Sequence, residues 1–239
     1  MLGEGIHVYY ICKSMRVVTW NCNMNFEKKF ELLRSLSPDI AIIQECEKLD
    51  INNFPNCQYF WCGKNEDKSM ALLVFNRSAK IDPIHKDNLI YFLPVISDDI
   101  KVLGVWAYNH RAEKFGEHCS GNTSDAISYY QDWLSSDEKI IVSGDFNNSV
   151  IWDKGKDNDF KNINQSLVDL GFQSSYHQYF KEEFGKETQG TLFHTKNKDK
   201  PYHIDYCYYK NFQLEKVELE NFDNWIKHSD HLPVIINLN

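Results

Sequence analysis

Apolar residues occur along this chain in two recurring patterns, short uninterrupted runs and residues at helical spacing. The run at 40–43 has no polar alternation, which is typical of a strand buried on both faces. Across 26–36, apolar residues recur at helical spacing, which predicts a helix that ends at Ser37-Pro38. The same criteria predict strands at 17–22, 70–76, 100–108, 139–143, 191–193, 203–209 and 232–238, and helices at 163–170 and from a cap at Ser124 or Asp125 through Leu134. A mixed α/β fold is therefore expected.

Length and composition favour a single domain. The chain has 239 residues, 42% of them hydrophobic, which is enough to enclose one core. We find no internal repeat and no biased linker that would divide it. No apolar stretch approaches the roughly 20 residues that cross a bilayer. Residues 1–14 lack the basic start and long apolar run of a signal peptide.

The seven cysteines indicate the redox setting. They are odd in number, scattered, and form no C-x-x-C pair. This pattern is typical of reduced, mostly buried thiols, and we expect a cytoplasmic protein. A bridge between Cys57 and Cys62 across a short loop is the alternative that their spacing leaves open.

Polar clusters interrupt the chain where the predicted strands begin or end. In chain order they are Trp20-Asn21-Cys22-Asn23, Gln44-Glu45, Gly144-Asp145-Phe146-Asn147, His203-Ile204-Asp205-Tyr206 and Ser229-Asp230-His231-Leu232-Pro233-Val234. Their order and composition resemble the endonuclease/exonuclease/phosphatase superfamily of metal-dependent phosphoesterases. The resemblance implies a four-layer α/β sandwich, in which two mostly antiparallel sheets pack face to face with helices outside.

The resemblance runs from about Met15 to the C-terminus. It implies one catalytic domain at residues 15–239, preceded by an N-terminal extension at residues 1–14. Because the family pattern begins at Met15, this methionine is a candidate start of the protein.

Cleavage of a phosphodiester by water requires charge neutralisation at the phosphoryl oxygens and activation of the water. Mg²⁺ and Mn²⁺ serve this purpose and prefer a few carboxylates together with waters and substrate oxygens. By the resemblance, Glu45 binds the metal, Asp230 helps to hold it, and Asn21 supports the metal or the substrate phosphate. Taken without the resemblance, strand-end acids are usually just solvated, and an asparagine there usually caps a turn.

Two further clusters are expected to carry the catalytic groups. Asp145 and Asn147 match the pair that positions the attacking water and donates a hydrogen bond to a phosphoryl oxygen. Asp205 matches the aspartate that orients the terminal histidine, so the resemblance pairs it with His231. Alternation along the strand at 203–209 would place His203 on the same face as Asp205, and a packing role for His203 is the simpler interpretation.

Tyr108 falls where related enzymes carry a tyrosine or histidine that donates to the phosphate or to the leaving oxygen. His110 lies close enough in the sequence to compete for this role. Many of the thirteen tyrosines must be structural, so the residue type alone is weak evidence.

Lysines cluster in two predicted loops. Lys64 and Lys68 follow an aromatic segment, and Lys196, Lys198 and Lys200 precede the strand of the catalytic aspartate. The resemblance places both loops near the mouth of the site, where lysines can contact phosphate. The alternative is that they are solvated loop residues.

These features favour a Mg²⁺- or Mn²⁺-dependent phosphodiesterase, most consistent with a nuclease that acts on DNA or RNA. The formal charge of −8, from 34 acidic and 26 basic residues, argues against wrapping nucleic acid by bulk electrostatics, but it allows a local basic rim. The alternative is a phosphatase or phosphodiesterase for a small-molecule or lipid phosphate, because substrate choice lies in the loops. A non-catalytic binding module is disfavoured, since each cluster keeps a competent residue type. We expect a monomer with no membrane span.

Overall fold

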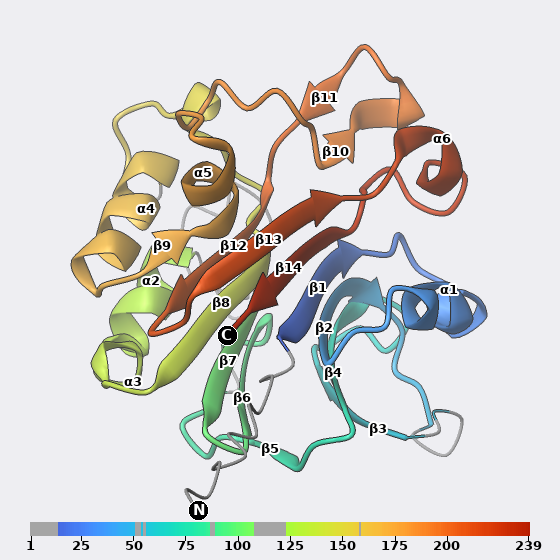
Figure 1. Ribbon diagram of the computed structural model, residues 1–239, viewed down its shortest axis with the longest axis vertical. Helices are drawn as coiled ribbons and strands as arrows, with labels where there is room; N and C mark the ends of the chain where they lie inside the picture. Colours follow the sequence, from blue (N-terminus) through green and yellow to red (C-terminus); the bar gives the residue numbers. More distant parts are fainter. Residues whose placement is uncertain (1–13, 51–53, 55, 87–88, 108–122, 158) are drawn as a thin grey trace, which may run out of the picture.

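The computed structural model describes residues 14–50, 54, 56–86, 89–107, 123–157 and 159–239 (Figure 1). Within these residues the strands form two six-stranded sheets and a separate two-stranded hairpin. The first sheet contains, in spatial order, β13 (Leu214–Leu219), β14 (Val234–Leu238), β1 (Met15–Asn21), β2 (Ile40–Cys46), β4 (Ser69–Phe75) and β3 (Cys57–Cys62). The second contains β5 (Ala79–Ile81), β6 (Phe92–Ser97), β7 (Ile100–Trp106), β8 (Lys139–Asp145), β12 (Asp205–Lys210) and β9 (Gln173–Ser174). The hairpin pairs β10 (Leu192–Phe193) with β11 (Pro201–Tyr202).

Helices cover the outer faces of both sheets, except that α5 packs against β12 and β13 at the side of the sandwich. They are α1 (Phe30–Ser35), α2 (Thr123–Tyr129), α3 (Gln131–Ser135), α4 (Phe160–Asp169), α5 (Ser175–Phe180) and α6 (Phe222–Trp225), with short 3₁₀ turns at Glu27–Lys29, Val150–Trp152 and His194–Lys196. Apolar side chains of both sheets, among them Ile42 and Leu72 of the first and Val102 and Ile141 of the second, form one buried layer between them. A second apolar cluster lies under α1 and α6, and a third lies under α2 to α4. The expected four-layer α/β sandwich is therefore confirmed.

The pairing of strands brings several chain segments to one edge of the sandwich. Asp145, at the end of β8, lies opposite Asp205, at the start of β12. Asn21, at the end of β1, lies opposite Gln44 of the parallel strand β2. Since His231 forms a bridge with Leu192, the β10–β11 hairpin lies at this same edge, together with α6 (Figure 1).

Gly144 shows why a glycine precedes Asp145. Its φ of +153° and its position against β7 leave no room for a side chain, because a Cβ there would lie 1.8 Å from the carbonyl oxygen of Val105. The strand that carries Asp145 can therefore pack closely beside β7.

Three elements of the structure differ in detail from those expected from the sequence. The helix expected to reach Leu134 begins at Thr123 and is divided into α2 and α3 at the buried Tyr130, so neither Ser124 nor Asp125 is its cap. The helix expected at 163–170 begins earlier, at Phe160, where the Asp153 carboxylate accepts hydrogen bonds from the first amide groups of α4.

The strand expected from His203 begins only at Asp205, so the expectation that strand alternation places His203 and Asp205 on the same face was wrong in its premise. Cys57 and Cys62 are free and lie at opposite ends of β3, which keeps them apart. Residues 1–13, in the expected N-terminal extension, lie outside the described residues. Among the helices described, none has the length and apolar character needed to span a membrane.

Candidate active site

A buried histidine–aspartate pair lies at the edge of the sandwich where β8 ends and β12 begins. His231 Nδ1 is 2.9 Å from Asp205 Oδ2, and the two residues are 6% and 1% exposed. The main chain of His231 is fixed separately: its N–H donates to Ser229 Oγ, and its carbonyl accepts from Trp20 Nε1. The pairing expected from the sequence is thus present in the structure.

The charge state of His231 follows from its neighbours. Burial lowers the pKa of His231, but the charge and hydrogen bond of Asp205 outweigh this effect, so the pKa rises to about 10. The ring is therefore an imidazolium at neutral pH. Its Nδ1 proton is held by Asp205, which leaves the Nε2 proton as the one that can be directed at a substrate.

Asp145 is fully buried, and its carboxylate is held by two asparagines. Asn21 Nδ2 and Asn147 Nδ2 each donate to Oδ2 at 3.0 Å, and the Asn147 main-chain N–H donates to Oδ1 at 2.8 Å. Burial raises the pKa of Asp145 to about 7, and the charge of Asp205 contributes to this rise. A carboxylate with such a pKa can accept a proton near neutral pH.

The Asn21–Asp145 hydrogen bond also joins the two sheets, because Asn21 ends β1 and Asp145 ends β8. The sequence assigned Asn21 to the metal or the phosphate. In the structure its amide nitrogen orients Asp145, while its amide oxygen accepts from the Asn23 main-chain N–H.

Oxygen atoms suited to a hard divalent cation lie within this cluster. A carboxylate oxygen of Asp145 and one of Asp205 lie within 4.8 Å of each other, beside the His231 ring. Asp205 Oδ1 is buried and has no hydrogen-bond partner among the described residues. Carboxylate and amide oxygens are the donors that Mg²⁺ and Mn²⁺ prefer, so the residues present fit such an ion.

Glu45 lies at an irregularity in β2, one residue after Gln44, which is opposite Asn21. The register of β2 against β4 shifts between Gln44 and Cys46, and Glu45 between them has a left-handed φ of 56°. This bulge turns Glu45 out of the regular strand alternation. Its Oε2 is 3.0 Å from Lys68 Nζ, and its side chain is 19% exposed.

Asp230 is linked to the cluster through the β1–α1 loop. Its Oδ1 accepts a hydrogen bond from Asn23 Nδ2 at 3.2 Å, and the Asn23 main-chain N–H donates to Asn21 Oδ1. Asp230 is partly exposed, whereas its neighbour His231 is buried.

The three lysines of the β10–β11 hairpin have different surroundings. Lys198 is 3.7 Å from Asp223 and lies over the Phe222 ring, so it faces α6. Lys196 lies at the end of the 3₁₀ turn, where its charge acts on Lys29. Lys200 is exposed at the base of the turn, where its main-chain carbonyl accepts from His194.

His203 packs in the interior. Its Nδ1 is 2.9 Å from the Gln189 carbonyl oxygen, and its ring centroid is 4.3 Å from that of Tyr176. These contacts fit the packing role. Tyr108 and His110 lie outside the described residues.

Thr191 is a supporting residue that sequence reasoning missed. Its Oγ1 accepts from the main-chain N–H groups of Ile204 and Asp205, both at 3.1 Å. Its carbonyl accepts from Leu232 at 2.7 Å, so this fully buried threonine fixes the segments on which Asp205 and His231 stand. A threonine before a short strand is too common to be recognised from sequence.

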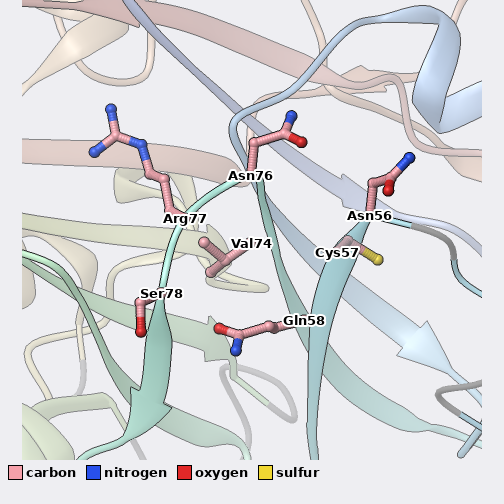
Figure 2. A pocket seen from close by; sticks show the side chains of 7 residues that line it. All are labelled: Asn56, Cys57, Gln58, Val74, Asn76, Arg77 and Ser78. Atoms are coloured by element: carbon pink, nitrogen blue, oxygen red, sulfur yellow. The ribbon is translucent and has the colours of Figure 1, made fainter.

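A polar hollow of about 390 Å³ lies elsewhere, lined by Asn56, Cys57, Gln58, Val74, Asn76, Arg77 and Ser78 (Figure 2). Cys57 pairs with Phe75 at this end of β3 and β4, while the Glu45 bulge lies where Cys46 pairs with Ser69. The hollow is therefore at the far end of the sheet from the acidic cluster.

A family profile matches the sequence of the chain, and solved structures match its fold. The sequence profile of the endonuclease/exonuclease/phosphatase family matches residues 18–231. No curated protein matches the chain. Among solved structures, the 3′-5′ exonuclease NExo from Neisseria meningitidis superposes with a TM-score of 0.72 at 17% identity, covering 94% of this chain and 100% of that one. An AP endonuclease from Archaeoglobus fulgidus gives 0.68 at 14% identity, covering 94% and 99%. A 3′ phosphatase NExo variant from Neisseria bound to a product DNA hairpin gives 0.70 at 17% identity, covering 94% and 99%.

Proposed function

The chain belongs to the endonuclease/exonuclease/phosphatase family of phosphoric ester hydrolases, and we propose that it is a divalent-metal-dependent nuclease that cleaves phosphodiester bonds of DNA or RNA. The observation that carries this proposal is the buried cluster of Asp145, Asp205 and His231, with Asn21 joining both sheets to it. The solved structures of similar fold include an exonuclease, an AP endonuclease and a 3′ phosphatase bound to DNA, which supports a nucleic-acid substrate.

In this proposal Glu45, Asn21 and Asp230 would hold Mg²⁺ or Mn²⁺. When bound, the ion would neutralise charge on the phosphate and lower the pKa of the attacking water.

Asp145 accepts the proton of the attacking water. Its two oxygens are already oriented by Asn21 and Asn147, so little reorganisation is needed when the water arrives. His231 donates its Nε2 proton toward a phosphoryl or leaving oxygen, while Asp205 stabilises the imidazolium. Tyr108, the other candidate donor, stays a proposal from the sequence.

A local basic rim gives this site a way to hold a polyanion in an acidic protein. Burial lowers the pKa of Lys29, and the charge of Lys196 lowers it further. Burial also lowers the pKa of His228, and the charges of Lys227, Lys29 and Lys196 add to the effect. Lys29, Lys196 and His228 therefore lie near one another, and a phosphate backbone would be a favourable neighbour for them.

Lys196→Ser is expected to raise KM for an oligonucleotide and to flatten its salt dependence, with little change in kcat. A phosphate contact made equally in the ground and transition states contributes uniform binding, and each lost contact reduces the salt slope by about one unit at most. The measurement is single-turnover cleavage across a salt series.

Lys198→Ser is the matched control, because Lys198 stands in the same loop but is paired with Asp223. Its salt slope should equal that of the wild type. Equal slopes for both variants would mean that Lys196 is merely solvated, and would favour a small phosphoester.

A small or lipid phosphoester is the second candidate substrate. The net charge of −8 favours it, because a substrate held inside the pocket needs no extended basic surface.

One activity panel separates these substrates. Plasmid, single-stranded oligonucleotide, abasic-site duplex, inositol phosphates and a generic phosphodiester are incubated with Mg²⁺, with Mn²⁺ and with excess chelator. We expect cleavage of a nucleic acid that the chelator abolishes. Activity confined to inositol phosphates would reassign the substrate, and full activity in chelator would overturn the metal mechanism.

A further inference from the structure

A lysine forms an ion pair with the carboxylate of Glu45. Lys68 Nζ is 3.0 Å from Glu45 Oε2, with the two side chains 38% and 19% exposed. Strand pairing produces this contact: Cys46, just after the bulge, lies opposite Ser69, and Lys68 directly precedes Ser69. The bulge that turns Glu45 out of its strand thus turns it toward Lys68.

The loop that carries Lys68 is well fixed. The Lys68 main-chain N–H donates to the Asn65 carbonyl, and the Asn65 side chain accepts from the N–H of Asp67. Gly63 allows the loop to start close to β4, since a Cβ there would lie 1.4 Å from Ser69 Oγ. The ammonium also lies 5.8 Å from the centroid of the Trp106 ring. Lys68 is therefore held near Glu45 by its backbone and by a second, aromatic contact.

We propose that Lys68 is a resident cation that competes with the divalent metal for Glu45, and thereby sets the metal concentration at which the site fills. The inference rests on the proposed role of Glu45 as a metal ligand. A metal ion binds a carboxylate oxygen at about 2.1 Å, so an ammonium that keeps its present contact would stand close to the ion.

The sign of the effect follows from the charges. A monovalent cation about 5 Å from a divalent ion weakens binding of that ion by about tenfold in water-like surroundings, and by more in a drier site. Loss of the ion pair itself costs little, because the Lys68 side chain is 38% exposed and pairs that are open to solvent contribute little to stability. The Trp106 ring offers the displaced ammonium a favourable neighbour, so Lys68 can withdraw without losing every contact. Removing the lysine charge should therefore tighten metal binding.

The test is calorimetric titration of the metal-free protein with Mn²⁺ alone. Lys68→Met is expected to lower the Kd about tenfold, while Lys68→Arg, which keeps the charge, retains the wild-type value. Lys48→Met is the matched control: Lys48 also forms an ion pair, 2.7 Å from Glu66, and lies 5.6 Å over the Trp61 ring. Its Kd should not change.

Glu45→Gln separates this inference from the proposed function. If Glu45→Gln weakens Mn²⁺ binding but Lys68→Met binds as the wild type does, the competition is disproved and the metal assignment stands. If Glu45→Gln leaves the Kd unchanged, both the assignment and the competition fail. The double variant should lose the gain of Lys68→Met, because the shared carboxylate is gone.

Discussion

Asp145→Asn is expected to lower kcat by about three to four orders of magnitude, since general-base catalysis commonly contributes 10²- to 10⁴-fold and the group also organises the site. The amide cannot accept the proton of the attacking water. It also brings an NH₂ group to a place where Asn21 and Asn147 both donate, so at least one donor loses its partner. The measurement is single-turnover hydrolysis at saturating metal.

The fold should survive this substitution. Burial disfavours the charged form of Asp145, as its raised pKa indicates, so a neutral side chain of the same shape relieves that cost. The melting temperature is therefore expected to change little. Asp137→Asn is the control, an exposed aspartate just before the other end of β8. Near-normal turnover in Asp145→Asn would remove this residue from the chemistry.

Much of the site was predictable because short motifs lie at strand ends. The pairing of Asp205 with His231 followed from the resemblance and is present at 2.9 Å. The link between Asn21 and Asp145 was not predictable, because it joins strands of different sheets whose face-to-face packing no local pattern encodes.

Side-chain partners in loops were the least predictable part of the site. Lys68 and the hairpin lysines looked equivalent as basic loop residues. Their partners depend on the bulge at Glu45 and on the position of Asp223 in α6, which arise only when distant segments pack. Thr191 likewise acquires its role from two main-chain N–H groups more than ten residues away along the chain.

Pro94 illustrates why some strands escaped sequence analysis. It lies within β6, although proline usually excludes a segment from a sheet interior. Its carbonyl accepts from Asp82, and β5 ends at Ile81, so the missing proline N–H points to the side where the neighbouring strand has already ended. The sequence alone does not show that β5 is this short. The strand β13 was missed for another reason, since it lies at the edge of its sheet and most of its side chains are not buried.

His231→Ala is expected to lower kcat by about three orders of magnitude, because a charged donor aimed at the reacting phosphate is lost. The substitution also leaves the Asp205 carboxylate buried without its partner, which lowers the free energy of unfolding by roughly 3 kcal/mol. The main chain at this position stays anchored through Ser229 and Trp20, so the domain should still fold.

A double-mutant cycle with Asp205→Asn tests whether the two residues act as one unit. Since Asp205 acts through His231, the double variant should have a kcat no lower than that of His231→Ala. In chemical denaturation the double variant should regain much of the stability that His231→Ala lost, because the unpaired Asp205 charge is gone. His228→Ala, a change at a partly exposed histidine three residues earlier, is the control: it should keep kcat and stability, because a group of the basic rim contributes only uniform binding. Additive losses in kcat would show that Asp205 has a separate role, such as a direct contact with the metal through its unpartnered Oδ1. A His231→Ala enzyme with more than a tenth of the wild-type kcat would exclude the histidine as the proton donor.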